Sequence, residues 1–226
     1  MIATPAFHYR FAFLCVVSLA GVSLLGACGR SDSTAAPAPA VQDKRATCQV
    51  PHSYVIGALG KNDEELFSAV EAGDARQAER SIGEGANVNT TGSLKRTPLF
   101  AAAFCDRPEL AKLLIDKGSK VDDLDSNGMS PLHAAVIVGG FDTAKILIAN
   151  GANINLTDGA GRTPLHLAAA TNQNSMVQML LERGANASVR DKKGMTAAAL
   201  ALDNGHKTPA AAIKDWQANE KTMRQK

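Results

Sequence analysis

The fold of this chain is decided by two stretches, Asp125-Ser-Asn-Gly-Met-Ser-Pro-Leu-His-Ala-Ala135 and Asp158-Gly-Ala-Gly-Arg-Thr-Pro-Leu-His-Leu-Ala168, which lie 33 residues apart. The same interval relates further positions along the chain, among them Gly85, Gly118, Gly151 and Gly184, the hydroxyl residues Thr97, Ser130, Thr163 and Thr196, and the alanines at 69, 102, 135, 168 and 201. An unbroken period of this length is the signature of a stacked repeat array.

Each period carries the signals of a helical hairpin. A hydroxyl residue that can cap a helix precedes Pro98, Pro131 and Pro164, and proline is well suited to the first helical position. Leucine and alanine follow at positions that can face a neighbouring hairpin. Gly118, Gly151 and Gly184 come where a second helix would end in a left-handed residue. One hairpin cannot bury its own apolar face, so stacking must supply the core.

These motifs resemble the ankyrin repeat, with its Thr-Pro-Leu-His start and its Leu-Leu-x-x-Gly-Ala close, over residues 62–215. The resemblance implies an all-α solenoid of stacked helix-turn-helix units, with three full repeats between an N-terminal and a C-terminal cap, in a domain spanning residues 62–220. The first unit has Glu64-Glu65-Leu66-Phe67 in place of the motif, and the last lacks its Pro and His. In the last unit, a second helix is expected to run through Pro209 to about Trp216, with a charged tail at 221–226.

The first 27 residues have the pattern expected of a signal sequence. Arg10 is followed by an apolar run from Phe11 to Ala27, which is short for a membrane span of about 20 residues. Leu25-Gly-Ala-Cys28 is similar to the lipobox of bacterial lipoproteins, which implies that residues 1–27 are removed and that Cys28 is acylated. Because Gly29 is not aspartate, the resemblance favours the periplasmic side of the outer membrane, with the inner membrane possible. The alternatives are an uncleaved signal anchor and an ordinary secretory signal.

Residues 28–47 are rich in Ser, Ala and Pro, which predicts a disordered tether behind the lipid. An apolar segment, 48–61, follows and is expected to pack on the array. With Cys15 in the signal and Cys28 lipidated, Cys48 and Cys105 remain in an oxidising compartment. We predict that they form a disulfide that holds the segment against the first full repeat; the alternative is two unpaired thiols.

Charge and motif content argue against several functions. After signal removal, 23 basic and 22 acidic residues leave a net charge of +1, and aromatic residues are few, so nucleic acid is not an expected partner. His133 and His166 occupy the motif position that in ankyrin repeats bonds the turn, so we interpret them, and His206, as structural. The Asp122-Asp123-Leu124-Asp125 run lacks the spacing of a calcium loop and is better explained as a solvated run. We therefore expect no catalytic residue, no metal and no cofactor.

The resemblance implies a binding surface on the concave face, formed by the loop tips and the exposed side of each first helix. The tips are predicted to present Leu94, Arg96, Leu124, Met129, Arg162 and Met195. The first helices are predicted to present Phe104, Cys105, Ile137, Val138, Ala170 and Thr171. Phe104, Ile137 and Val138 are notable because polar residues are expected there. They could bind a partner, or they could seat the chain's own segment 48–60.

The sequence thus predicts a non-catalytic, monomeric, lipid-anchored module that binds an envelope protein through its concave face. An alternative with the same features is an immunity-type inhibitor of a periplasmic toxin or hydrolase.

Overall fold

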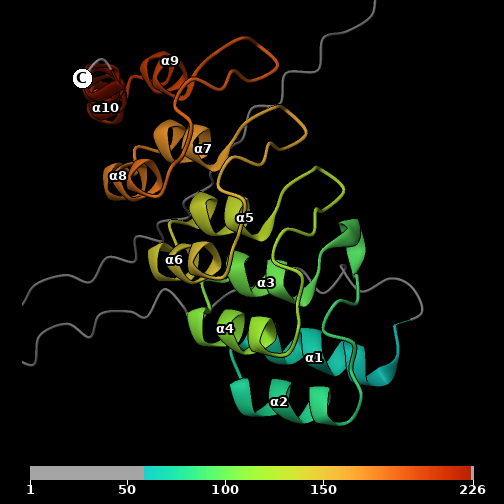
Figure 1. The fold of residues 1–226 in the computed structure, drawn as a ribbon. Coiled ribbons are helices and arrows are strands. Elements are labelled where there is room, and N and C mark those ends of the chain that lie inside the picture. The colour runs from blue at the N-terminus through green and yellow to red at the C-terminus, as the bar shows by residue number, and fades with distance from the viewer. Residues whose placement is uncertain (1–58, 225–226) are drawn as a thin grey trace, which may run out of the picture. The chain divides into compact units, whose positions relative to one another are not determined.

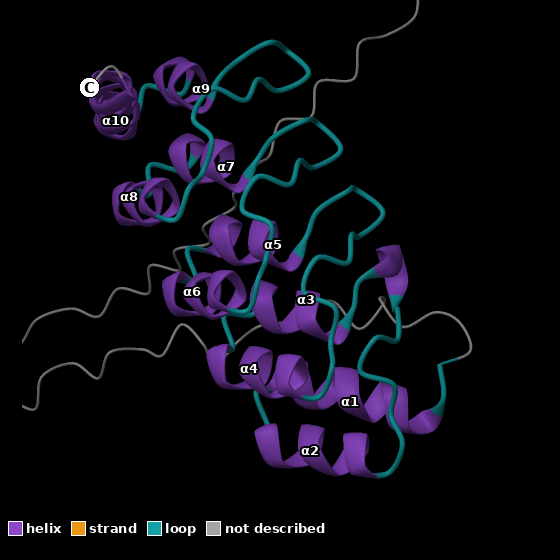
Figure 2. Cartoon of the chain, viewed as in Figure 1, coloured by secondary structure: helices purple, strands orange, loops and turns teal. Residues whose placement is uncertain are grey.

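The computed structural model describes residues 59–224, and its regular structure there consists of helices (Figures 1 and 2). The α-helices are α1 (Lys61–Ala72), α2 (Ala75–Gly83), α3 (Pro98–Phe104), α4 (Pro108–Asp116), α5 (Pro131–Val138), α6 (Phe141–Ala149), α7 (Pro164–Ala170), α8 (Asn174–Glu182), α9 (Ala197–Asp203) and α10 (Lys207–Arg224), with a 3-10 turn, η3, at Ser93–Lys95. The predicted all-α solenoid is confirmed.

The helices form five hairpin units, α1–α2 to α9–α10, stacked in sequence order. The odd-numbered helices pack on one another in an inner layer, and the even-numbered helices form an outer layer. Long loops precede α3, α5, α7 and α9 and project together (Figure 2). We call their tips, residues 91–97, 124–130, 157–163 and 190–196, the first to fourth fingers.

The inner helices begin as their caps predict. The hydroxyl groups of Thr97, Ser130 and Thr196 accept hydrogen bonds from backbone N–H groups in the first turn, and Thr163 caps α7 in a capping box. A proline occupies the first turn of α3, α5 and α7. The prediction of a helix start at each Thr/Ser-Pro step is therefore confirmed.

The core runs without a break through the stack. Each inner helix after α1 contributes a fully buried alanine, Ala102, Ala135, Ala168 or Ala201, and the three full repeats add Leu99, Leu132 and Leu165. Alanine lets neighbouring inner helices approach closely. Burial of each leucine side chain contributes about 1.5–3 kcal/mol, so the stacked leucines supply a large part of the driving force.

The last helix is longer than expected. α10 continues to Arg224, whereas the sequence analysis ended it near Trp216 and placed a charged tail at 221–226. Pro209 lies within the first turn, where a missing N–H removes no intrahelical bond. No glycine follows before Arg224, and the helix therefore continues through residues that were expected to be tail.

Several predictions lie outside the described residues. These are the signal sequence 1–27, the lipidated Cys28, the tether, Cys48 and almost all of the segment 48–61. Within the described part of the chain, none of the helices combines the length and the hydropathy that a membrane crossing requires.

Candidate binding surfaces

The second, third and fourth fingers are each organised by one buried aspartate. In the second finger, Asp125 Oδ1 accepts hydrogen bonds from the backbone N–H groups of Asn127 and Met129, at 2.8 and 2.9 Å. Asp158 and Asp191 make the same pair of contacts in their fingers. The aspartate of the Asp-x-x-Gly turn thus holds its own loop together by hydrogen bonds.

The fingers are joined to one another by backbone hydrogen bonds. The N–H of Ser126 donates to Leu94 O at 2.7 Å, Gly159 to Asn127 O at 2.8 Å, and Lys192 to Ala160 O at 2.9 Å. These bonds recur every 33 residues, so each finger is seated on the one before it. The finger tips therefore form a continuous, ordered surface.

The two motif histidines bond both their own turn and the next finger. His133 Nδ1 accepts from the Ser130 N–H at 3.2 Å, and its Nε2 lies 3.0 Å from Arg162 O. Because a carbonyl can only accept, Nε2 must carry the proton, which fixes the neutral tautomer. His166 does the same between Thr163 and Met195 O. The prediction that both are structural agrees with this geometry.

Burial controls the ionisation of these histidines. It lowers the pKa of His133 and of His166 below the ordinary value, and the bonds to the carbonyls, which favour the proton, only partly oppose this effect. In Asp158, burial raises the pKa, but hydrogen bonds from the backbone and guanidinium of Arg162 outweigh it, and the net shift is downward. The third finger therefore holds a carboxylate beside a neutral imidazole.

The predicted tip arginines are held in place by these aspartates. Arg162 pairs with Asp158 in its own finger, with Nη2 and Oδ2 2.8 Å apart. Arg96 reaches instead into the second finger, where its Nε lies 3.5 Å from Asp125 Oδ2. The Arg96 guanidinium also lies over the rings of Phe100 and Phe104, at 4.9 and 5.8 Å from their centres.

The first finger is built differently from the other three, and this difference was not predicted from the sequence. Gly92 stands where the other fingers have aspartate, and Lys95 stands where they have glycine. Leu94 and Lys95 both adopt left-handed backbone angles, with φ of 57° at each. Such a conformation costs a non-glycine residue about 1–2 kcal/mol. The absent Asp-x-x-Gly pattern at 92–95 was the signal that could have revealed it.

The structure divides the predicted surface residues into two groups. Those that are exposed are Leu94, Leu124, Ile137, Val138 and Thr171, and those that are half-buried are Arg96, Phe104, Met129, Arg162 and Met195. Cys105 was placed on the exposed side of α3, and that is wrong. It follows the last residue of α3 and is buried, as the helix end turns inward toward α4.

Four of the exposed residues are large and apolar, and we call them the apolar row: Leu94, Leu124, Ile137 and Val138. Their exposed fractions are 42, 43, 38 and 41%. Leu94 and Leu124 lie on adjacent, hydrogen-bonded fingers, and the other two end α5. The equivalent residues of α7 are Ala170 and Thr171, so the row is confined to the first two full repeats.

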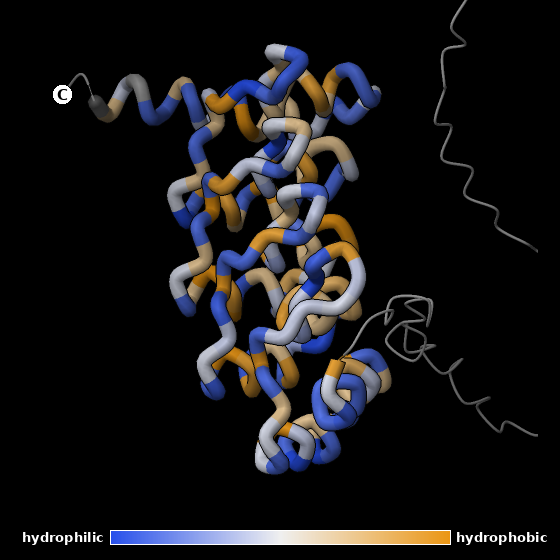
Figure 3. The backbone as a smooth tube through the Cα atoms, turned by 90° about the vertical axis from the view of Figure 1, so that its right-hand side faces the viewer, coloured by the Kyte–Doolittle hydropathy of each residue, from blue (hydrophilic) through white to orange (hydrophobic). Residues whose placement is uncertain are grey.

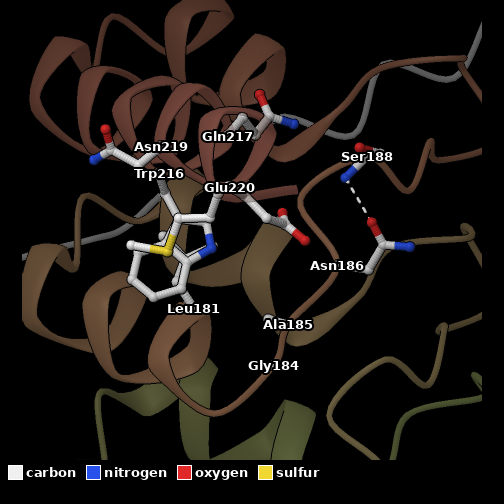
Figure 4. Close-up of a pocket in the computed structure, with 10 residues that line it drawn as sticks. Leu181, Gly184, Ala185, Asn186, Ser188, Trp216, Gln217, Asn219 and Glu220 are labelled. Atoms are coloured by element: carbon white, nitrogen blue, oxygen red, sulfur yellow. Dashed lines mark hydrogen bonds between the residues drawn. The ribbon is translucent and has the colours of Figure 1, made fainter. Parts of the chain in front are cut away.

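A hollow that was not predicted, the α10 groove, lies at the C-terminal end of the array. It encloses about 950 Å³ between α10 and the loop after α8 (Figure 4). Its walls include Leu181, Ala185, Trp216 and Met223, with Asn186, Ser188 and Glu220 at polar positions. The groove exists because α10 extends beyond the nine residues of α8, and the sequence reading stopped that helix too early.

The acidic run at 122–125 has a structural use. Asp122 accepts from the Asn153 N–H at 3.0 Å, which links one outer loop to the next, while Asp125 holds the second finger. Over residues 59–224, no group of three His, Cys, Asp or Glu side chains is arranged to bind a metal ion.

Comparison with known families agrees with this architecture. Two family models, both described as ankyrin repeats, match residues 66–158 and 147–201, which together make up more than half of the chain. The chain belongs to the ankyrin-repeat family. Among curated proteins, none matches it. Ankyrin repeats are typically non-catalytic interaction domains, so this ankyrin-repeat array is best regarded as a module for binding proteins.

Proposed function

We propose that this ankyrin-repeat protein is a lipid-anchored adaptor on the periplasmic side of the outer membrane, where it binds an envelope protein through its concave face. The observation that carries the proposal is the apolar row. Four large apolar side chains stay substantially exposed on ordered backbone, although the array has a complete core of its own.

The row has the composition of a binding site. Scattered apolar residues are normal on protein surfaces, whereas grouped ones mark interaction sites. Leu94 and Leu124 form one group on adjacent fingers, and Ile137 and Val138 form a second at the C-terminal end of α5. Arg96 lies near Leu94 on the first finger, and burial of one such leucine or isoleucine by a partner would contribute about 1.5–3 kcal/mol. The row fits an apolar segment of a partner that spans two repeats.

The anchor is supported by the sequence of the N-terminal region. Leu25-Gly-Ala-Cys28 closes an apolar run, and the polar tether that follows would hold the array away from the bilayer. Two or more acyl chains on Cys28 would give stable membrane attachment. Substituting Cys28→Ser should move the protein from the membrane fraction to the soluble fraction of cells, and unchanged fractionation would contradict the anchor.

A Cys48–Cys105 disulfide belongs to the same proposal. The Cys105 side chain is engaged rather than free, and it is buried where α3 gives way to α4. Such a bond would tie the segment before α1 to the first full repeat. Mass spectrometry of non-reduced peptides should recover the cross-linked pair, and two free thiols would exclude it.

The binding face is tested by affinity purification from envelope extracts. Leu124→Asp and Ile137→Asp place charges in the apolar row and should lose the partner. Gln178→Asp, on the exposed surface of α8, is the matched control and should retain it. Retention of every partner by both row variants, with native circular dichroism, would refute the concave-face assignment. Recovery of a toxin or hydrolase would favour the immunity-type role instead.

A further inference from the structure

Charge is distributed unevenly along the array. Residues 59–84, which form the first unit, contain seven acidic and three basic residues, a net charge of −4. Residues 188–226, which contain the fourth finger and the last unit, have eight basic and four acidic residues, a net charge of +4. The residues between them contain nine of each sign. The two ends of the array are therefore oppositely charged.

The C-terminal end also exposes a residue at a stacking position. Leu202 of α9 is 45% exposed, whereas Ala103, Val136 and Ala169, which precede it at intervals of 33 in inner helices that are each followed by a further unit, are all fully buried. In the outer layer, Lys214 follows Ile148 and Leu181 at intervals of 33, and both of those residues pack in or against the core. The C-terminal end therefore exposes positions that are buried elsewhere in the array. The residue at such a position is apolar in the inner layer and basic in the outer layer.

Two series of hydrogen bonds join neighbouring units, one between fingers and one between outer loops. At the C-terminal end, each series ends at a group that could accept one more bond. Lys193 O is the next in the series of finger carbonyls, and among the described residues no backbone N–H reaches it. Ser188 follows Asn89, Asp122 and Asn155, whose side chains each accept a backbone N–H from the next outer loop. Figure 4 shows Ser188 among the residues that line the α10 groove.

The N-terminal end has the complementary character. Ser68 of α1 is exposed, while Ala101, Ala134 and Leu167, which follow it at intervals of 33 in inner helices that each have a unit before them, are buried. Glu64 precedes Ser68 by one helical turn and is also exposed. The outer surface of the first unit is therefore polar and acidic where the array would receive a preceding unit.

We propose that the C-terminal end of one molecule receives the acidic first unit of a second copy, so that the arrays stack head to tail. The occupant is identified by its opposite charge and by the stacking positions that each end leaves uncovered. Two C-terminal ends would repel one another, which disfavours a two-fold contact. The head-to-tail contact joins two different surfaces, so each molecule that binds leaves a further end free and molecules can add in a row. The monomer that the sequence analysis expects is then the form present at low protein concentration. This inference does not depend on the partner bound by the apolar row.

The test uses residues 42–226, which include the whole array and its core from residues 66 to 213. Sedimentation velocity over a concentration series should show association at about 0.05 M salt that weakens at about 0.5 M, where the contact is screened. Lys193→Glu/Lys214→Glu should weaken association by about tenfold or more, and Glu64→Lys/Ser68→Lys should do the same. An equimolar mixture of the two variants should associate again, because each altered end then meets its opposite.

The control is Lys117→Glu/Lys145→Glu, which makes the same change in net charge on exposed residues within the stack. It should associate like the unaltered fragment. A monomer at every concentration would overturn the proposal, as would association that the mixture fails to restore. Loss of association in Leu202→Glu without any effect of Glu64→Lys/Ser68→Lys would also overturn it, because the contact would then join two C-terminal ends. Pelleting of the monomeric fragment with phosphatidylglycerol vesicles would assign the basic end to the membrane.

Discussion

The way the fingers are seated on one another can be tested at Gly128. Its φ is +73°, and a Cβ built there would lie 2.8 Å from the backbone N of Gly159. That same nitrogen donates the bond to Asn127 O which joins the second and third fingers. Gly194 occupies the equivalent place in the fourth finger with φ of +77°, and its Cβ would meet nothing within 4 Å.

The pair of substitutions separates strain from stacking. In both Gly128→Ala and Gly194→Ala, the left-handed backbone costs about 1–2 kcal/mol. Gly128→Ala must also push the third finger away, which adds about 1–3 kcal/mol of misfit and weakens a hydrogen bond worth about 0.5–1.5 kcal/mol. We expect a loss in the free energy of unfolding of about 3–5 kcal/mol for Gly128→Ala, against about 1–2 kcal/mol for Gly194→Ala.

Urea unfolding followed by far-ultraviolet circular dichroism measures this difference. The m-value should be the same for both variants, so the midpoints report stability directly. Gly161→Ala, whose Cβ would lie 3.0 Å from Lys192 N, should fall between the two. Equal losses for Gly128→Ala and Gly194→Ala, within about 0.5 kcal/mol, would mean that the fingers are not in contact as described.

Three further changes probe other contacts of the stack. The midpoint of urea unfolding should decrease as the pH falls below about 6.5, because the unfolded chain protonates His133 and His166 before the folded one does; in His133→Phe/His166→Phe the midpoint should vary much less between pH 7 and 5. Thr143→Val removes a buried donor 2.7 Å from a carboxylate and should cost about 1–3 kcal/mol by thermal or urea unfolding. Asn155→Ala removes the acceptor of a 2.7 Å bond between outer loops and should cost about 1–2 kcal/mol, whereas Ser188→Ala at the end of the same series should change stability by less than about 0.5 kcal/mol. Equal effects of these last two would argue against the loop-to-loop contact.

The parts of the fold that follow local rules could be predicted from the sequence. Thr97, Ser130 and Thr163 begin helices as predicted because capping and proline geometry act over a few residues. Gly118, Gly151 and Gly184 have the expected positive φ. The period placed the leucines and alanines in the core, since every unit repeats the same burial. The order of the units and the structural use of His133 and His166 followed from the same regularity.

The rest depends on contacts between units, which the period alone does not reveal. Lys95 adopts a left-handed angle where the other fingers have glycine, and Asp106 and Asn172 do so where Gly73, Gly139 and Gly205 stand in the other units. The cross-finger reach of Arg96 arises because Gly92 leaves the first finger without its own carboxylate. The burial of Cys105 and the length of α10 reflect how the chain ends are covered, and no repeated position specifies either.

The extensive helix contacts lie within units or between adjacent ones, and this has a mechanical consequence. Among the described helices, none of the first unit makes extensive contact with the last unit. Tension along the array would therefore detach the units in succession instead of all at once. α6 and α8 pack less closely than α4 with α6 or α8 with α10. Under load, the outer layer should part there first, and the array would yield elastically at that joint before any unit is peeled away.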